Sequence, residues 1–170
     1  NYNDVDFVGL STYLSLTEEY TSNTDALVNG WYSNTEGVNV KEQLNAFLDR
    51  VGNKDVFFTE FGSPATHVGN YIFSAELATP SPPDTEGHTV WIDEALEFVA
   101  QNFSDRIDGL FLYNWELGRP LEWRDTTSAA WDFRDKPALS AVSEWFNQSG
   151  PIDGISEGGS NYSDSMRGGP

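Results

Sequence analysis

Apolar residues gather into three short runs along the chain. The runs are VDFVGLSTY (5–13), DVFFTEFG (55–62) and IDGLFLYNWEL (107–117). Because they lack a regular alternation of polar and apolar residues, they are typical of strands buried on both faces, as in parallel sheets. The pattern therefore predicts three strands of one parallel sheet.

Each run is followed by a segment whose apolar residues recur at helical spacing. These segments cover 39–52, 88–103 and 135–151. In the first, Asn39 and Glu42 have the spacing of a capping box and Gly52 is a typical C-terminal stop. The repeated order of strand and helix predicts an α/β fold with a parallel sheet.

The connections between these elements favour a barrel over an open sheet. The segments from strand to helix are long (14–38, 63–87 and 118–135), whereas those from helix to strand are only a few residues. A (β/α)8 barrel whose active face is built from βα-loops shows this asymmetry. No Gly-rich phosphate fingerprint follows a strand, which argues against a nucleotide site. Three strand-helix units cannot close a barrel of eight strands, so we expect residues 1–150 to form part of a TIM barrel.

The composition changes after Pro151. Residues 151–170 are rich in Gly, Ser and Asp and carry no apolar stripe, which predicts a linker or tail. The last residues, SDSMRGGP, resemble the approach to a calcium-binding repeat of the RTX type, but only the first half of one repeat is present. A flexible linker is the alternative, and no calcium site is assigned.

Charge and composition exclude several functions. Nine Lys and Arg against 27 Asp and Glu give a formal net charge of −18, which repels nucleic acid and anionic membranes. No apolar run approaches the roughly 20 residues that span a bilayer. The chain has no cysteine and two histidines without an acidic partner at ligand spacing, so we expect no metal site and no cofactor.

Polar and aromatic residues stand at the predicted carboxyl ends of the strands. They are Ser11, Thr12 and Tyr13 on the first, Glu60 on the second, and Asn114, Trp115 and Glu116 on the third. Sugars are bound by aromatic rings that cover C–H faces and by polar groups that bind hydroxyls. The long loops add further aromatic residues: Tyr20, Trp31, Tyr32, Tyr71, Phe73, Trp123 and Trp131. The cluster predicts a carbohydrate site.

Glu60 is the candidate catalytic residue because it ends a strongly apolar run. A carboxylate at the rim of an apolar core is costly unless it is hydrogen-bonded, and such groups are often functional. In a retaining glycosidase this carboxylate attacks the anomeric carbon, and a second carboxylic acid about 5 to 5.5 Å away protonates the leaving oxygen. His67 follows the same strand and could hydrogen-bond a sugar hydroxyl. The alternatives are a structural salt bridge or cap for Glu60, simple packing for Tyr13, and a surface position for His67.

The three strand motifs together resemble those of a known family. DFVGLSTYLSLTEEY, VFFTEFGSPA and GLFLYNWEL, followed by RDKPALSAVSEWF, are similar to strands six to eight of clan A (β/α)8 glycoside hydrolases, most closely family 113, which is β-mannanase-like. The resemblance covers about residues 4–148. It implies that Glu60 is the nucleophile, that Tyr13 hydrogen-bonds it, and that Trp115 forms the floor of the subsite beside the cleaved bond.

The resemblance leaves one catalytic role unassigned. The family's acid/base glutamate ends strand four, which would precede this chain, so the chain alone is expected to be inactive. Glu116 matches no family acid and, with Asn114, is expected to contact substrate. The predicted function is a retaining hydrolase of β-linked polysaccharide or oligosaccharide located outside the cell. The alternatives are a non-catalytic carbohydrate-binding or structural barrel module and another clan A family with a different substrate.

Overall fold

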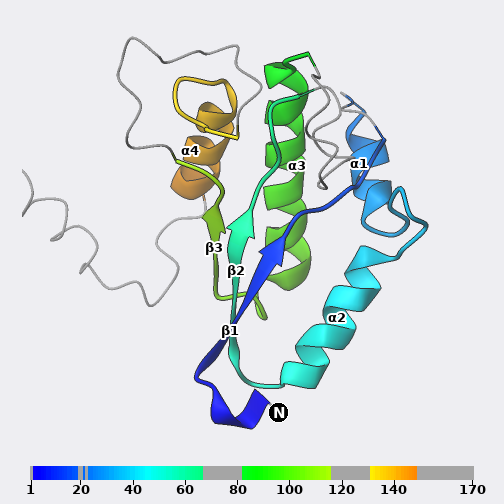
Figure 1. The fold of residues 1–170 in the computed structure, drawn as a ribbon, viewed down its shortest axis with the longest axis vertical. Coiled ribbons are helices and arrows are strands. Elements are labelled where there is room, and N and C mark those ends of the chain that lie inside the picture. The colour runs from blue at the N-terminus through cyan, green and yellow to red at the C-terminus, as the bar shows by residue number, and fades with distance from the viewer. Residues whose placement is uncertain (1, 19–20, 22, 67–81, 116–130, 149–170) are drawn as a thin grey trace, which may run out of the picture.

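The computed structural model describes residues 2–18, 21, 23–66, 82–115 and 131–148. After a short 3-10 helix, η1 (Tyr2–Asp4), come the strands β1 (Phe7–Thr12), β2 (Asp55–Phe61) and β3 (Gly109–Leu112). All neighbouring strands are parallel, in the order β1-β2-β3 (Figure 1). The predicted parallel sheet is confirmed. The predicted tail, residues 151–170, lies outside the described residues, so the domain boundary stays a prediction.

The three predicted helices are present, with shifted ends. They are α2 (Val40–Val51), α3 (Thr85–Phe103) and α4 (Ala138–Gln148). α2 begins as expected, because the Asn39 side chain accepts a hydrogen bond from the Glu42 amide at 3.0 Å. It ends at Gly52, whose φ of 70° is in the left-handed region that favours glycine.

α3 begins earlier than the sequence pattern indicates. The Asp84 side chain accepts a hydrogen bond from the Gly87 amide at 2.8 Å, which caps the helix before the first apolar residue of the stripe. A further helix, α1 (Thr24–Gly30), lies in the segment that was predicted to be loop only. Asn23 caps it in the same way, at 3.3 Å from the Ala26 amide.

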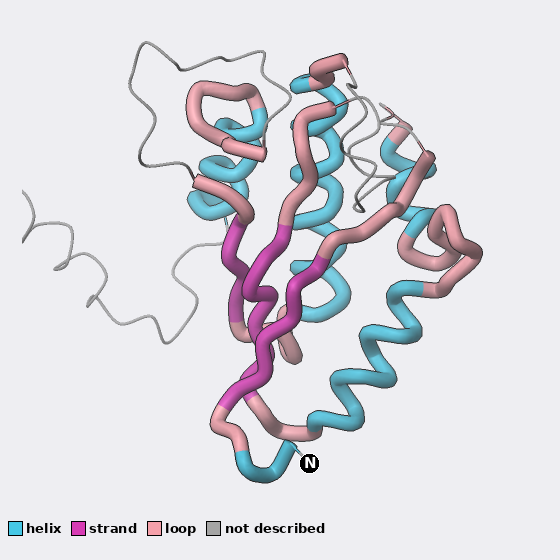
Figure 2. The backbone as a smooth tube through the Cα atoms, in the orientation of Figure 1, coloured by secondary structure: helices cyan, strands magenta, loops and turns pink. Residues whose placement is uncertain are grey.

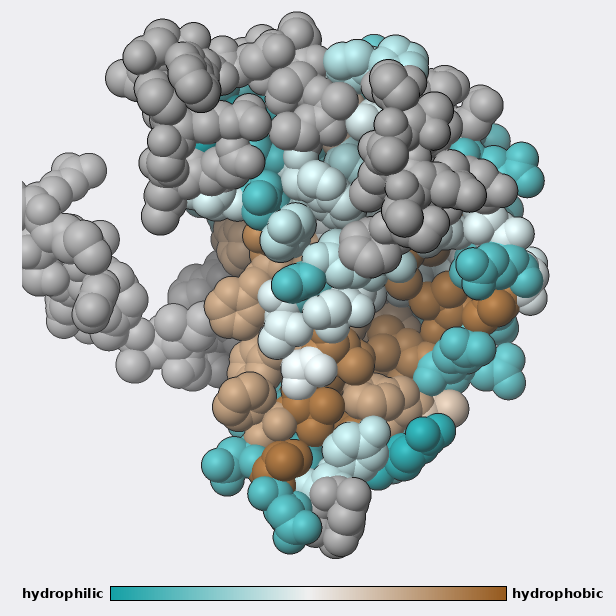
Figure 3. Space-filling model, in the orientation of Figure 1, coloured by the Kyte–Doolittle hydropathy of each residue, from teal (hydrophilic) through white to brown (hydrophobic). Residues whose placement is uncertain are grey.

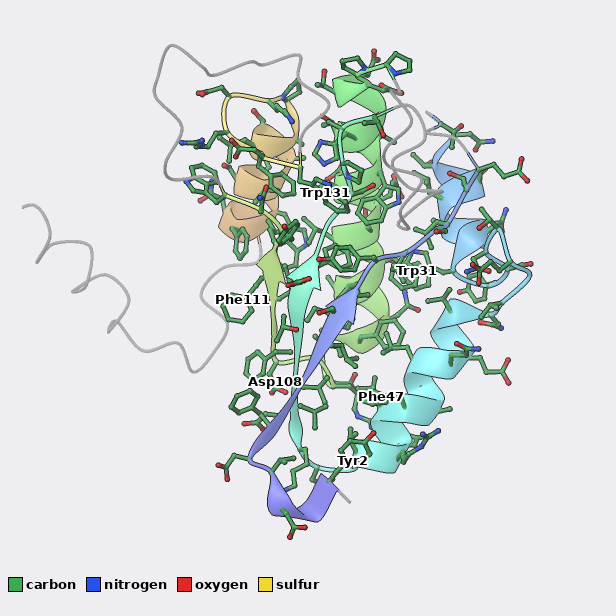
Figure 4. The ribbon with its side chains drawn as sticks, in the orientation of Figure 1. Tyr2, Trp31, Phe47, Asp108, Phe111 and Trp131 are labelled. Atoms are coloured by element: carbon green, nitrogen blue, oxygen red, sulfur yellow. The ribbon has the colours of Figure 1, made fainter. Side chains whose placement is uncertain are left out.

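The core lies between the sheet and the helices on one of its faces. α2 and α3 lie on that side in Figure 2, and α4 packs against α3. Phe58 of β2 and Leu48 of α2 are fully buried there, as are Trp91 and Leu96 of α3. At the amino end of the sheet, Asp108 joins β3 to β2, because its carboxylate accepts from the Val56 amide at 2.7 Å (Figure 4).

Among the described residues nothing covers the opposite face of the sheet, so within this part of the chain the strands are not buried on both faces as the apolar runs predict. Phe7 is 60% exposed and Phe111 63% exposed, and Phe111 points away from α3 (Figure 4). Apolar residues also gather over the lower part of the surface around β1 (Figure 3). The physical reason is that the described helices cover one face only, whereas a closed barrel also fills its interior.

Candidate active site

The carboxyl ends of the three strands meet at one edge of the sheet (Figure 1). Tyr13 follows β1, Glu60 lies near the end of β2, and Tyr113 follows β3. In parallel α/β folds this edge is where ligands bind. The structure therefore places the predicted nucleophile on the edge where catalytic groups are expected.

A β-bulge in β2 directs Glu60 toward the open face. Along β1, Leu10 pairs with Phe58 but the next residue, Ser11, pairs with Glu60, so β2 carries one extra residue. The pairing with β3 is also irregular between Phe58 and Phe61. Strict alternation would put Glu60 beside Phe58 on the covered face. Instead Phe61 occupies that face, fully buried and stacked on Phe58 at 5.7 Å between ring centroids.

The Tyr13 hydroxyl donates a hydrogen bond to Oε2 of Glu60. Burial of the phenol, this hydrogen bond and the negative charge of Glu60 raise the pKa of Tyr13 well above its usual range, and nearby Tyr113 adds to the shift. The phenol therefore stays protonated at any ordinary working pH. It can donate to Glu60 throughout, which leaves the other carboxylate oxygen available for chemistry.

The ring of Tyr13 packs against two other aromatic rings. We call Tyr13, Tyr113 and Trp131 the aromatic cluster, because each ring packs edge-to-face on the other two. The ring centroids are 6.2 Å apart for Tyr13 and Tyr113, 5.6 Å for Tyr13 and Trp131, and 5.5 Å for Tyr113 and Trp131. Trp131 lies beyond the carboxyl ends of the strands (Figure 4).

Sequence reasoning did not select Tyr113. The signal was present, because Tyr113 shares the alternation of Gly109 and Phe111 and so extends the open face of β3. In the sequence, Trp131 is only one of several loop aromatics. Its contact with the two tyrosines depends on how the segment before α4 folds back, which no local pattern predicts.

The ends of β2 and β3 approach each other closely at Gly62. The Tyr113 amide donates to the Phe61 carbonyl at 2.9 Å. A Cβ atom placed on Gly62 would lie 2.3 Å from the Tyr113 carbonyl oxygen. Only glycine fits there, so the position of Tyr113 at the end of β3 depends on the absence of a side chain at residue 62.

The binding residues predicted at the end of the third strand are Asn114, Trp115 and Glu116, and the first two differ in exposure and contacts. Trp115 is 49% exposed, and the Arg134 guanidinium lies 6.0 Å from its ring centroid. Arg134 pairs with Asp132 at 3.0 Å. Asn114 Oδ1 is buried, and within the described part of the chain no donor lies within hydrogen-bond distance of it. Glu116 lies outside the described residues, so its predicted role stays a prediction.

Solved structures of β-mannanases share this fold. The chain matches a structure described as a complex of a GH113 β-1,4-mannanase with a TM-score of 0.62 and 14% identity over 86% of this chain. A second structure of a GH113 β-1,4-mannanase has a TM-score of 0.59 and 15% identity over 83% of this chain. The GH113 β-mannanase AaManA from Alicyclobacillus acidocaldarius in complex with ManMIm has a TM-score of 0.59 and 16% identity over 85% of this chain.

At these identities the likeness shows the fold alone. This chain has a GH113-like partial α/β fold, which is compatible with part of a TIM barrel. It spans only about 40% of the length of these solved chains. No protein-family model matches the chain, and no curated protein matches it. Whether the units are strands six to eight of such a barrel stays a prediction.

Of the loop aromatics, which the sequence alone cannot divide between packing and sugar contact, Trp31 belongs to the packing. Its side chain is 1% exposed and stacks on Phe98 of α3 at 4.3 Å between ring centroids. It is therefore a core residue that holds α1 against α3. Tyr32 beside it is 47% exposed. The remaining loop aromatics of the prediction, Tyr20, Tyr71, Phe73 and Trp123, lie outside the described residues, as does His67.

Among the described residues, no group of three or more His, Asp or Glu side chains is arranged to hold a metal ion. None of the helices in the same ranges is both long and apolar enough to cross a bilayer.

A buried histidine behind the site makes stability depend on pH. His88 of α3 is fully buried, and burial together with the charge of Lys136 lowers its pKa to about 3, although a hydrogen bond with the Ser63 backbone opposes the shift. The unfolded chain binds this proton near pH 6.5. The contribution of His88 to the free energy of unfolding should therefore be fully present above pH 6.5 and be lost as the pH drops toward 3, by up to about 1.4 kcal/mol per pH unit.

Denaturant unfolding of the wild type and of His88→Leu between pH 7 and 4 checks this prediction. Only the slope with pH is compared, because the substitution also changes packing. The wild type should lose stability more steeply, and parallel curves would contradict the assignment.

Proposed function

We propose that the protein is part of a retaining glycoside hydrolase in which Glu60 is the nucleophile. The observation that carries the proposal is the hydrogen bond from Tyr13 to Glu60 at the carboxyl edge of a parallel sheet with a β-mannanase-like fold. A carboxylate with a purely structural role would not need a β-bulge that directs it toward the open face. Nor would it need a hydrogen bond from a phenol that stays protonated. Both features support a carboxylate that is held for reaction.

The proposed reaction has two steps. The free oxygen of Glu60 attacks the anomeric carbon, the bond to the leaving oxygen breaks, and its electron pair leaves with that oxygen, which a carboxylic acid outside this chain protonates. Water then attacks the glycosyl ester and restores the carboxylate. Tyr13 holds Oε2 in place during both steps, so that the attacking oxygen needs little reorientation.

The proposed substrate is a β-linked polysaccharide or oligosaccharide. The solved structures with this fold are described as β-mannanases, which favours a β-1,4-linked mannose chain as the first candidate. The half-exposed ring of Trp115 offers a flat apolar face for a pyranose, as proposed for a subsite floor, and Asn114 is proposed to contact substrate nearby. Action on a polymer outside the cell is part of the proposal.

The stereochemistry of cleavage tests this function. The full-length protein is incubated with β-1,4-manno-oligosaccharides, and the first product is observed by proton NMR before mutarotation. Retention predicts that the β anomer appears first. An α anomer as first product would contradict a covalent intermediate on Glu60, and tight binding without cleavage would indicate a carbohydrate-binding module instead.

A further inference from the structure

Tyr13 lies beyond the last paired residue of β1. The ladder with β2 ends where Thr12 pairs with Phe61, so the strand pairing does not fix the Tyr13 side chain. Its hydroxyl nevertheless donates a hydrogen bond to Oε2 of Glu60. The ring contacts of the aromatic cluster therefore help to set the direction of the phenol, together with the hydrogen bond itself.

Of the two neighbouring rings, that of Trp131 belongs to a segment with a buried turn. It directly precedes Asp132 and Phe133, which are 6% and 2% exposed. The Asp132 carboxylate accepts from the Arg134 amide at 3.1 Å and from its guanidinium at 3.0 Å. Tyr113, in contrast, is 38% exposed. The Trp131 ring is thus presented by a buried turn, and its centroid lies closer to that of Tyr13 than the centroid of Tyr113 does.

We propose that Trp131 is a positioning residue that orients the Tyr13 phenol toward Glu60. Edge-to-face aromatic pairs add a stabilisation beyond the area that they bury, enough to favour one ring orientation several-fold. The catalytic consequence of this positioning role rests on the proposed function, because the role acts on the carboxylate of Glu60. The proposal assigns Trp131 a role through Tyr13 and not a direct contact with sugar.

The first test needs no activity and uses the full-length protein at neutral pH. A hydroxyl proton held on a carboxylate exchanges slowly and resonates far downfield in the proton NMR spectrum, and Tyr13→Phe identifies the signal of Tyr13. We expect the signal in the wild type and in Trp131→Phe, which keeps a ring, and its loss in Trp131→Leu. Melting temperatures and amide spectra of the two Trp131 variants show that both are folded. A signal that persists in Trp131→Leu, or that is absent from the wild type, would overturn the proposal.

The second test uses the full-length protein and separates positioning from sugar binding. Trp131→Leu should lower kcat by up to about 10²-fold with little change in KM, since a small misplacement of a catalytic group has effects of this size. In a Tyr13→Phe background the same substitution should have almost no further effect. A higher KM with unchanged kcat, or full additivity of the two changes, would contradict the role. If the NMR result is as expected but the full-length protein cleaves no glycan, the proposed function fails while the positioning role stands.

Discussion

Replacing Glu60 by alanine in the full-length protein is expected to lower kcat by about 10⁴-fold or more, the scale of loss when a nucleophile is removed from an enzyme with a covalent intermediate. The reason is that no other group can form the glycosyl ester at this position. Initial rates on a β-linked manno-oligosaccharide or an activated aryl glycoside measure the effect.

Azide provides the matching rescue experiment. The anion fits the space left by the carboxylate and attacks from the same side, so part of the activity should return and the product should be a glycosyl azide of inverted configuration. Glu97→Ala is the control, because Glu97 is an exposed residue of α3 whose side chain accepts from Gln101. Wild-type rates in Glu60→Ala, or an equal loss in Glu97→Ala, would exclude the assigned role.

The substitution Gly62→Ala should cost about 1 to 3 kcal/mol in the free energy of unfolding, the range for forcing extra atoms into a packed site. The added methyl group would lie 2.3 Å from a backbone oxygen of Tyr113, which cannot rotate away as a side chain does. The ends of β2 and β3 must therefore separate. We expect turnover to fall as well, because Tyr113 moves with the end of β3 and the aromatic cluster opens. Denaturant unfolding of this chain measures the first effect, and kcat of the full-length protein the second.

Gly109→Ala is the control for this prediction. It adds the same methyl group to β3, but the nearest atoms belong to the Phe57 ring, at 3.3 Å, which can shift. Its effect on stability should be clearly smaller and kcat should be nearly unchanged. Equal destabilisation by the two substitutions would show that the close approach at Gly62 has no special importance.

Local signals in the sequence were sufficient to predict most of the fold. The continuous apolar runs placed the three strands, and Asn39 and Gly52 marked the two ends of α2, because caps act through neighbouring residues. α1 was missed, since it is short and its burial depends on the contact between Trp31 and Phe98, which are far apart in sequence. The open face of the sheet was not predicted, because an apolar run indicates that a strand is buried but not which other segments bury it.

The sequence was sufficient to predict which residues form the candidate site but not how they are arranged. The strand motifs indicated Glu60 and Tyr13, and the structure joins them by a hydrogen bond. The bulge that turns Glu60 toward Tyr13 depends on pairing with both neighbouring strands, and no local pattern in β2 signals it. The ring contacts of Trp131 likewise depend on tertiary packing.

Covalent trapping on Glu60 tests the central claim most directly. The full-length protein is treated with an activated 2-deoxy-2-fluoro glycoside, which forms the glycosyl ester but hydrolyses it slowly, and is then digested and analysed by mass spectrometry. We expect one sugar per protein molecule, attached to the peptide that contains Glu60. A label on another carboxylate, in a protein that cleaves the same sugar with retention, would contradict the assignment of Glu60 as the nucleophile.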